Sequence, residues 1–595
     1  MEYRATISRR RLLRTMGLSL AGLGAIQLVA ACTPAAPAAT PTEPAKVPAP
    51  ASTPTGLPGP TAASAQQAPS TKVTAGASVI AGPEGGFMRT PEGNVKRGGT
   101  ARHAGQISTA HYDIHQGANV WAVGQMYNNL VRFNLTDGLQ TIIPDLAERW
   151  DVSPDGKSYT FTLRDGVQFH DGTPFTSADV QATFQRIIFP PQGMASILKD
   201  LFDSVEKVEA TDPRTVRFSL KEARPWLLEV FTNPTCIIYS KKALDASNQD
   251  LRKIIAPGTG AFMHKEVREG EKWIMAKNAT YWDKELPYVD SLEMLHLPEW
   301  TDRGTAVLTG QAELTLNTSV EMYMEGQGRS DVVTSRQLPS TGVYMVYYNA
   351  AQKPFDDPRV RRAINLTLNH QDIIQAFGNN EAIKFSRWIP RASSYATPED
   401  QLATLPGYRH DKTEDVPAAK KLLADAGMPD GVPNVDLVCA SVASHSQILA
   451  PAIQEQLKRN LNVDAKIRVV ERGVLTQELM NGKFNLGIVA NTMVTTLDPA
   501  PLWNQCFKTG GSQNLGRYTN TKFDDLLAQI NRETDVDKRR KLVGDAQGVL
   551  DDDPPWFVLG WTDHNPIWRN TTKGLALDKR QASELGRMET IWLDT

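Results

Sequence analysis

Residues 145–184 read DLAERWDVSPDGKSYTFTLRDGVQFHDGTPFTSADVQATF, and this stretch decides the fold. The tetrapeptide Ser-Pro-Asp-Gly at 153–156 predicts a turn, because Pro fixes φ and Gly supplies the position that needs φ > 0. Polar and apolar residues alternate over 158–163. This alternation predicts a half-buried strand with its aromatic and leucine side chains on one face.

The second half of the stretch predicts another turn and a helix. Asp171-Gly172 is typical of a turn, and Thr176 or Ser177 is a candidate N-cap for a helix that reaches Phe184. This order of turns and polar positions resembles the N-terminal signature of the family 5 solute-binding proteins of ABC importers. That family takes up oligopeptides, dipeptides, chelated nickel and some oligosaccharides.

Further segments resemble landmarks of the same family and follow the family's order. They are PGTGAF at 257–262 (Ala261 stands where Pro is usual), Asn278, Tyr281-Trp282, Pro287, Leu308, Gly310, Glu313, Asn349, 354–357, 360–364, 419–427, 535–539 and 573–575. The resemblance covers essentially all of residues 98–580.

The resemblance implies an α/β fold of the type II periplasmic-binding-protein class. In that fold two lobes face each other across a cleft, two crossing strands form the hinge, and an extra domain is inserted in the N-terminal lobe. Transferred to this chain, lobe one is expected at 98–144, 258–344 and 556–595, the extra domain at 145–257 and lobe two at 345–555.

Local patterns in lobe two predict a βαβαβ unit. Strands are expected at 435–439, 465–470 and 484–490, and helices at 446–461 and 474–480. Such a unit gives parallel strands with right-handed crossovers. Two more helices are expected: one begins at Asp357-Pro358 and runs to about residue 377, and one runs from Pro417 to a left-handed cap at Gly427.

The first residues predict export and lipidation. SRRRLLR at 8–14 fits the twin-arginine pattern, although the same basic cluster also suits the general secretory route. The sequence LVAAC at 28–32 resembles a lipobox, so we expect residues 1–31 to be a cleaved signal peptide and Cys32 to carry the lipid. The alternative, a transmembrane anchor, needs a longer apolar run.

The residues after Cys32 predict a tether. Residues 33–70 are mostly Pro, Ala, Thr and Ser, so we expect 32–97 to be a lipidated Cys and an extended linker. The protein is then expected at the outer face of the cytoplasmic membrane, periplasmic or extracellular, and attached through the lipid only. The resemblance implies three partners, namely a small solute, an ABC permease and its ATPase, and we expect a monomer.

Composition argues against several other classes. The full chain has formal charge −2, and its first 31 residues carry five Arg and one Glu, so the remainder is near −6. We find no basic run in the body, which argues against nucleic acid as a partner. Cys236, Cys439 and Cys506 are too few and too widely spaced for a disulfide framework, and at most one bridge is expected.

We find none of the common catalytic motifs in the sequence, so we expect that the protein is not an enzyme and that it binds no cofactor and no metal. HExxH, GxSxG, P-loop and GxGxxG patterns are absent. The pair His111/His115 is a weak metal candidate, and Asp551-Asp552-Asp553 is interpreted as a solvated helix end. A secreted, lipid-anchored hydrolase with paired carboxylates remains the alternative.

The expected ligand site lies beyond the carboxyl ends of the parallel strands. The loops there are 441–445 and 491–503, and the second supplies Asn491, Thr495, Asp498 and Trp503. Trp503 has an equally good alternative as lobe core. The resemblance adds a larger set of candidate ligand-binding residues, namely Arg387, Trp388, Tyr347 and Asn349 from lobe two, and Tyr112 and Asp113 from the segment 106–115 of lobe one.

The resemblance also bears on the ligand. Peptide-binding members hold the substrate ammonium with an Asp three residues before the Asp of an Asp-Pro pair. Here that pair is Asp498-Pro499, and the position holds Thr495, which offers a hydroxyl but no charge. We therefore expect a neutral polyol, an oligosaccharide or another small metabolite rather than an ordinary free peptide. Asp498 is the alternative carboxylate if the loop shifts.

Overall fold

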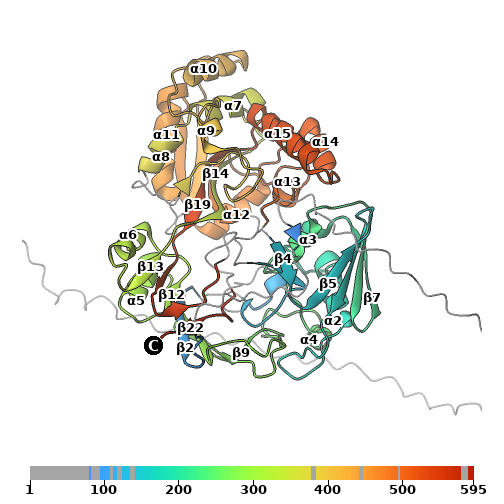
Figure 1. Cartoon of the computed structure of the whole chain (residues 1–595). Helices are drawn as coiled ribbons and strands as arrows, with labels where there is room; N and C mark the ends of the chain where they lie inside the picture. Colours follow the sequence, from blue (N-terminus) through green and yellow to red (C-terminus); the bar gives the residue numbers. More distant parts are fainter. Residues whose placement is uncertain are drawn as a thin grey trace, which may run out of the picture. The chain divides into compact units, whose positions relative to one another are not determined.

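The structure is a computed structural model of the 595-residue chain (Figure 1). It describes residues 80–81, 94–106, 111–116, 124–134, 141–376, 383–440, 446–492, 496–577 and 587–595. The predicted signal peptide, Cys32 and nearly all of the tether lie outside these residues. Helices and strands alternate along the described part, in agreement with the expected α/β class.

Two sheets contain the strands of the expected lobe one and extra domain. The seven-stranded sheet has the order β13 (Val333–Ser335), β20 (Ile567–Arg569), β12 (Leu314–Thr315), β2 (Thr100–Gly105), β11 (Ser291–His296), β10 (Lys272–Lys277) and β9 (Phe262–Arg268). The four-stranded sheet has the order β5 (Ala147–Val152), β6 (Ser158–Leu163), β8 (Thr215–Leu220) and β7 (Val205–Asp212).

A six-stranded sheet forms the centre of the expected lobe two. Its order is β15 (Ile383–Lys384), β19 (Trp556–His564), β14 (Leu338–Tyr348), β18 (Leu486–Thr492), β16 (Val435–Ala440) and β17 (Ala465–Val470). Strand β16 pairs in parallel with both β17 and β18, which confirms the predicted parallel unit. Two small sheets join β1 (Ile80–Ala81), β4 (Thr141–Pro144) and β3 (Val131–Phe133), and β21 (Thr572–Lys573) and β22 (Trp592–Leu593).

The helices divide between the same regions of the chain. Those before β14 are η1 (Ile114–Gln116), α2 (Ser177–Ile188), η3 (Lys199–Phe202), α3 (Leu227–Phe231), α4 (Lys241–Ala246), α5 (Trp300–Leu308) and α6 (Val320–Gly328). Those after β14 are α7 (Pro358–Thr367), α8 (His370–Ala376), α9 (Glu399–Leu402), α10 (Asp415–Asp425), α11 (Ser446–Leu461), α12 (Arg472–Asn481), α13 (Pro499–Cys506), α14 (Thr521–Ile530) and α15 (Val536–Asp552).

Strands β14 and β19 carry the chain between the two large sheets. β19 pairs with β14 over most of its length, and only after Asn565-Pro566 does β20 join the seven-stranded sheet. By hydrogen bonding, the change of sheet therefore falls at 565–566. The domain bounds expected from the sequence, with the return to lobe one at residue 556, stay a prediction.

The stretch that opens the sequence analysis folds as predicted. The turns have positive φ at Gly156 (+67°) and Gly172 (+79°), and β6 buries alternate residues. The apolar face of β6 joins an aromatic core whose neighbouring ring centroids lie 4.8–5.8 Å apart. The members of this core are Phe161, Phe184, Phe202, Phe218 and Phe231.

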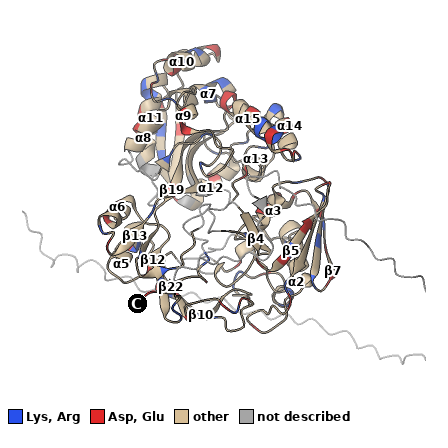
Figure 2. Ribbon diagram, in the orientation of Figure 1, with Lys and Arg blue, Asp and Glu red and all other residues tan. Residues whose placement is uncertain are grey.

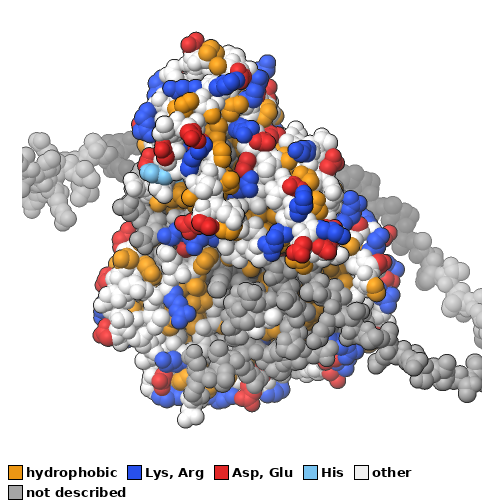
Figure 3. Space-filling view, turned by 45° about the horizontal axis from the view of Figure 1, so that its top comes forward, with side chains coloured by type: hydrophobic (Ala, Val, Ile, Leu, Met, Phe, Trp, Pro, Cys, Tyr) orange, Lys and Arg blue, Asp and Glu red, His pale blue; other side chains and the backbone are white. Residues whose placement is uncertain are grey.

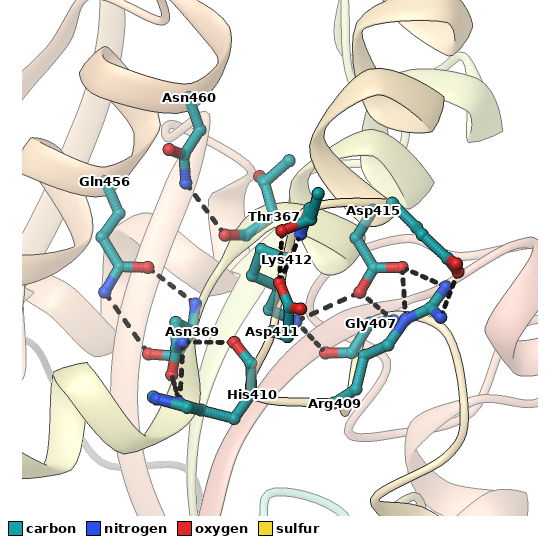
Figure 4. A network of polar contacts seen from close by, with 12 residues as sticks. Thr367, Asn369, Gly407, Arg409, His410, Asp411, Lys412, Asp415, Gln456 and Asn460 are labelled. Atoms are coloured by element: carbon teal, nitrogen blue, oxygen red, sulfur yellow. Dashed lines mark hydrogen bonds and ion pairs between the residues drawn. The ribbon is translucent and has the colours of Figure 1, made fainter.

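The helix predicted from residue 358 to about 377 is instead two helices, α7 and α8, and that prediction was wrong. Leu368 leaves the helical region with φ −72° and ψ 120°. The backbone N–H of Asn369 donates to Gln456 Oε1 at 2.7 Å (Figure 4). The Asn369 side chain also accepts from the N–H of Asp372 at 3.2 Å. A distant partner on α11 thus ends one helix and Asn369 caps the next.

The same network fixes the start of α10. The Asp415 carboxylate accepts from the Gly407 N–H at 3.0 Å and from Arg409, and Lys412 lies 3.5 Å from it (Figure 4). α10 therefore begins at Asp415, two residues before the predicted start. Gly427, with φ +82°, supplies the predicted left-handed position after it.

Charges of both signs are mixed over the described residues. Figure 2 shows Lys, Arg, Asp and Glu interspersed along α10, α14 and α15. Figure 3 shows the same mixture on the face in view, between uncharged side chains. No helix in the described ranges combines the length and apolar character that a bilayer span requires.

Candidate functional site

A pocket lies where β14, β19 and the start of α13 meet. Its empty space, counted together with adjoining open solvent, is about 270 Å³, and it is lined by Thr341, Val343, Pro390, Thr496, Asp498, Pro499, Leu502 and Trp561. Two of its lining residues, Thr496 and Asp498, follow the carboxyl end of β18. The pocket therefore occupies the place where ligands bind in open α/β sheets.

The register of the two long strands explains which side chains face this pocket. Val343 of β14 pairs with Trp561 of β19, and Pro339 pairs with Asp563. Because alternate residues of a strand share a face, Asp563 lies on the same face as Trp561. Trp561 donates its indole N–H to the Arg387 carbonyl at 3.3 Å, so the segment 387–391 covers this face.

Asp498 caps α13 and is held by a buried arginine. Its carboxylate accepts from the Ala500 N–H at 2.9 Å and from two guanidinium nitrogens of Arg539 at 2.6 and 3.0 Å. Both side chains are 0 % exposed. An ion pair of this geometry is satisfied within the protein, so the carboxylate lacks free capacity for a ligand ammonium.

Four other candidate residues from lobe two have structural partners. Arg387 and Trp388 both donate to Asp551, through Nε at 3.0 Å and Nε1 at 2.7 Å. Tyr347 is fully buried against Trp556, with ring centroids 5.0 Å apart. Asn349 is also buried, and its amide donates to the carbonyls of Gly482 and Phe484 at 3.0 and 2.9 Å.

Trp503 belongs to the core. It is 0 % exposed, and its indole N–H donates to the Trp388 carbonyl at 3.3 Å. The core alternative weighed for this residue therefore describes its position. Thr495 lies outside the described residues. Asn491 belongs to β18, and only its backbone is described.

The lobe-one candidates differ in their surroundings. Tyr112 is half-buried with its ring edge against Trp273, at a centroid distance of 5.8 Å. Asp113 is fully buried and forms an ion pair with Arg186, whose Nη1 lies 3.2 Å from Oδ1. Asp113 therefore anchors the segment 111–116 to α2.

The weak metal candidate at His111/His115 has a different role. The Nδ1 of His115 lies 3.0 Å from an Arg186 nitrogen, and its Nε2 lies 3.1 Å from the Ile237 carbonyl oxygen. Burial, together with the Arg186 charge, lowers the pKa of His115 to about 3, so the ring is neutral and fully bonded. In the part of the chain that the structure describes, no group of three or more His, Cys, Asp and Glu side chains is arranged to hold a metal ion.

The Asp551–Asp553 run ends α15 as expected, and Asp552 is solvated, with 67 % of its side chain exposed, whereas Asp551 and Asp553 are half-buried. Asp551 accepts from Arg387, Trp388 and Tyr408, Asp552 lies 2.9 Å from Arg362, and Asp553 pairs with Arg361. Each carboxylate thus ties the end of α15 to another segment. The three cysteines of the body are all buried and free.

The sequence analysis missed an ion pair beside the pocket. Arg391 follows Pro390, and its Nη1 lies 3.6 Å from Oδ2 of Asp563. Lys384 pairs with Trp561 across β15 and β19, and its charge also acts on Asp563. Burial raises the pKa of Asp563 to about 6 against the opposing effect of both cations. No local pattern points to this group, because its members come from three separate segments.

Comparison with known proteins places these features in a family. The model of the bacterial extracellular solute-binding proteins, family 5, matches residues 141–514. The glutathione-binding proteins GsiB of Salmonella typhimurium and Escherichia coli K12 are each 27 % identical over 425 residues, which cover 70 % of this chain and 79 % of theirs.

Solved structures agree with this match. The periplasmic binding protein DppA of Helicobacter pylori, in complex with the peptide STSA, is 25 % identical with a TM-score of 0.72, and the match covers 84 % of this chain and 99 % of DppA. The murein tripeptide binding protein MppA of Escherichia coli shares the fold, with 21 % identity, a TM-score of 0.70 and the same coverage. The predicted two-lobed type II fold is thereby confirmed, and the chain belongs to the family 5 solute-binding proteins of ABC importers.

Proposed function

We propose that this protein is the lipid-anchored receptor of an ABC importer, and that it delivers a small solute to a membrane permease and its ATPase. The family match over residues 141–514 carries the proposal. The protein then works outside the cytoplasm, as a monomer, held by a lipid on Cys32. A tether between Cys32 and the lobes raises the effective concentration of the receptor near the permease.

Binding rather than catalysis is the proposed activity. Two lobes that each supply part of a ligand's surroundings gain their full contacts only when they close on it. The hinge for such closure is assigned to the chain segments around 336–338 and 564–567, next to the pocket beneath Trp561. No catalytic step is needed for this role.

The proposed solute is not an ordinary free-amino peptide. Desolvating an ammonium without a charged partner is unfavourable, and a charge-assisted hydrogen bond contributes about 1.5–3 kcal/mol, or one to two decades of affinity. Thr495 cannot supply that charge, and Asp498 is held by Arg539. The named relatives bind glutathione or peptides, and residue 495 is where we expect this chain to depart from peptide binders.

The proposed ligand contacts follow from their positions along the chain and around the pocket. Tyr112 on the lobe-one side, Asn491 of β18 and Thr495 remain candidates from the sequence. The pocket residues Thr341 and Trp561 join them by position alone, because both side chains are buried in this structure. Asp113, Arg387, Trp388, Tyr347, Asn349, Asp498 and Trp503 are assigned supporting roles, because their side chains are bonded or packed inside the protein.

Calorimetry with a panel of free-amino dipeptides, N-blocked peptides, oligosaccharides and nickel chelates tests the proposal. We expect at least one solute without a free ammonium to bind with micromolar or lower Kd. Submicromolar binding of free-amino dipeptides would contradict the substrate assignment. Turnover of any panel member by the purified protein would contradict the assignment as a receptor.

A further inference from the structure

We call the pocket lined by Thr341, Pro390 and Trp561 the hinge pocket. Two Arg–Asp pairs lie close to it, and they differ in whether their charged groups are hydrogen-bonded to each other. Arg539 and Asp498 form a closed pair, with hydrogen bonds at 2.6 and 3.0 Å and no exposure. Arg391 and Asp563 form an open pair at 3.6 Å, beyond hydrogen-bonding distance, and the Arg391 side chain is 32 % exposed.

The donors of Arg391 are available. A guanidinium carries five N–H donors in a planar fork that fits a carboxylate in bidentate fashion. Within the described residues Arg391 makes no hydrogen bond, and its ion pair with Asp563 is its one close charged contact. By contrast, Arg387, four residues earlier on the same segment, is bonded to Asp551.

Arg391 lies next to the pocket, although it is not itself one of the lining residues. Its neighbour Pro390 lines the pocket, and its partner Asp563 shares a strand face with the pocket residue Trp561. Lys384 also lies on this face, because it is the cross-strand partner of Trp561. The three ionisable side chains therefore stand beside the pocket on one surface.

The local charge balance favours an anion. Arg391 and Lys384 contribute two positive charges and Asp563 at most one negative charge, while the Asp498–Arg539 pair is neutral. The excess of positive charge is confined to the strand face of Arg391, because the buried Glu229 carboxylate accepts from the Leu497 N–H between the pocket residues Thr496 and Asp498. Burial also raises the pKa of Asp563 to about 6, which means that its surroundings disfavour the charged carboxylate. Asp563 is therefore a weak competitor of a solute carboxylate for Arg391.

We propose that Arg391, supported by Lys384, is an anion-recognition subsite of the hinge pocket, and that the imported solute presents a carboxylate to it. The inference rests on the proposed solute-binding function and narrows the substrate class to carboxylated solutes. In the absence of ligand, Asp563 then positions Arg391. When the solute binds, its carboxylate replaces Asp563 as the partner of Arg391.

The test uses solutes in matched pairs that differ by one carboxylate. An N-acetyl dipeptide acid is compared with its C-terminal amide, and a uronic-acid disaccharide is compared with its neutral counterpart. A sugar phosphate serves as the dianion. Affinities are measured by calorimetry on the full-length protein and on the variants Arg391→Gln and Arg362→Gln.

Arg362→Gln is the matched control. Arg362 is 39 % exposed and pairs with Asp552 at 2.9 Å; it lines a separate pocket beside His370 and Tyr408 and does not line the hinge pocket. We expect a carboxylated member to bind at least tenfold more tightly than its neutral partner. Arg391→Gln is expected to weaken the acid by about tenfold to a hundredfold and to leave the neutral partner unchanged, whereas Arg362→Gln changes neither.

Failure of the subsite and failure of the receptor assignment give different results. If acid and neutral partners bind equally, if Arg391→Gln leaves the preference for the acid intact, or if the sugar phosphate is preferred, the carboxylate subsite is wrong and the receptor assignment stands. If no member of the panel binds, both are contradicted. Equal thermal midpoints of Arg391→Gln and the unmodified protein show that lost affinity is not lost folding.

Discussion

Arg539 donates two hydrogen bonds to Asp498, at 2.6 and 3.0 Å, in an ion pair that solvent does not reach. Asp498 also caps α13, the helix that borders the hinge pocket. The sequence analysis named Asp498 as the alternative carboxylate for a ligand ammonium. In the structure this carboxylate is instead part of the scaffold that positions the pocket wall.

Removing one partner of this pair is expected to destabilise the protein. Asp498→Ala leaves the Arg539 guanidinium buried without its partner, which costs about 3–5 kcal/mol. Urea unfolding followed by tryptophan fluorescence measures the change in the free energy of unfolding.

The control for Asp498→Ala breaks an exposed pair on α15. Lys541 and Asp545 lie 2.8 Å apart with side chains 78 % and 48 % exposed. We expect Asp545→Ala to cost less than about 1 kcal/mol. If Asp498→Ala were as mild as the control, the pair would not hold the scaffold as described.

The Gly-Thr-Gly turn at 258–260 is expected to tolerate no side chain. A Cβ on Gly258 would lie 1.9 Å from the Met126 carbonyl oxygen, and one on Gly260 would lie 2.4 Å from the Met126 carbonyl carbon. This close approach allows a hydrogen bond, in which the Gly260 N–H donates to the Met126 carbonyl oxygen at 2.9 Å. We expect Gly260→Ala to lower the free energy of unfolding by more than about 2 kcal/mol, because the backbone must shift.

Gly548→Ala on α15 is the matched change for this turn. A Cβ there meets no atom within 4 Å, so Ala is expected to stabilise the helix by about 0.5–1 kcal/mol. The same urea titration measures both variants. A Gly260→Ala protein as stable as the Gly548→Ala protein would show that the turn does not require glycine.

Asp563 is expected to make stability depend on pH. Its pKa is raised from 3.8 to about 6, chiefly by burial, so the folded protein binds this proton more tightly than the unfolded chain does. The resulting contribution to stability is complete below pH 3.8 and is lost as the pH rises through 6. Asp563→Asn, which cannot ionise, should therefore raise the free energy of unfolding at pH 8 by about 1–3 kcal/mol.

At pH 4 the same substitution should have little effect, because the carboxyl is protonated in the folded protein. The charged groups that act on Asp563 are Arg391 and Lys384. The adjacent His564 has a pKa lowered to about 4 by burial, so it is neutral from pH 6 upward. A stability difference that does not change between pH 5 and pH 8 would contradict the assignment to Asp563.

Cys32 is expected to hold the protein on the membrane without contributing to ligand binding. Cys32→Ala removes the thiol that accepts the lipid, so the protein should move from the membrane fraction to the soluble fraction. Fractionation and immunoblotting measure the distribution, and calorimetry on the released protein should give an unchanged Kd. Weaker binding after release would mean that the tether takes part in the site.

Local patterns predicted the elements that local interactions determine. The turn, strand and helix between 153 and 188 follow from Gly, alternation and capping, and each depends on neighbours within a few residues. The parallel unit around β16 was predicted for the same reason. The break between α7 and α8 was missed, because its cause is Gln456, 87 residues away from Asn369.

The site was less accessible from sequence than the fold. Asp498, Asn349 and Arg387 carry the residue types expected of ligand contacts, yet their partners Arg539, Phe484 and Asp551 can be identified only in three dimensions. The open pair of Arg391 and Asp563 spans 172 residues and depends on the pairing of β15 with β19. Sequence reasoning therefore located the region of the pocket but not its available charges.

Small-angle scattering of the full-length protein, with and without its tightest-binding solute from the panel, tests the central claim most directly. A receptor whose two lobes close on their solute should show a smaller radius of gyration when the solute is present. The Arg391→Gln variant is measured at the same solute concentration, which lies below the Kd of that variant. Its radius of gyration should then equal that of the free protein. The same radius for the free and the saturated protein would contradict the account of a hinged receptor.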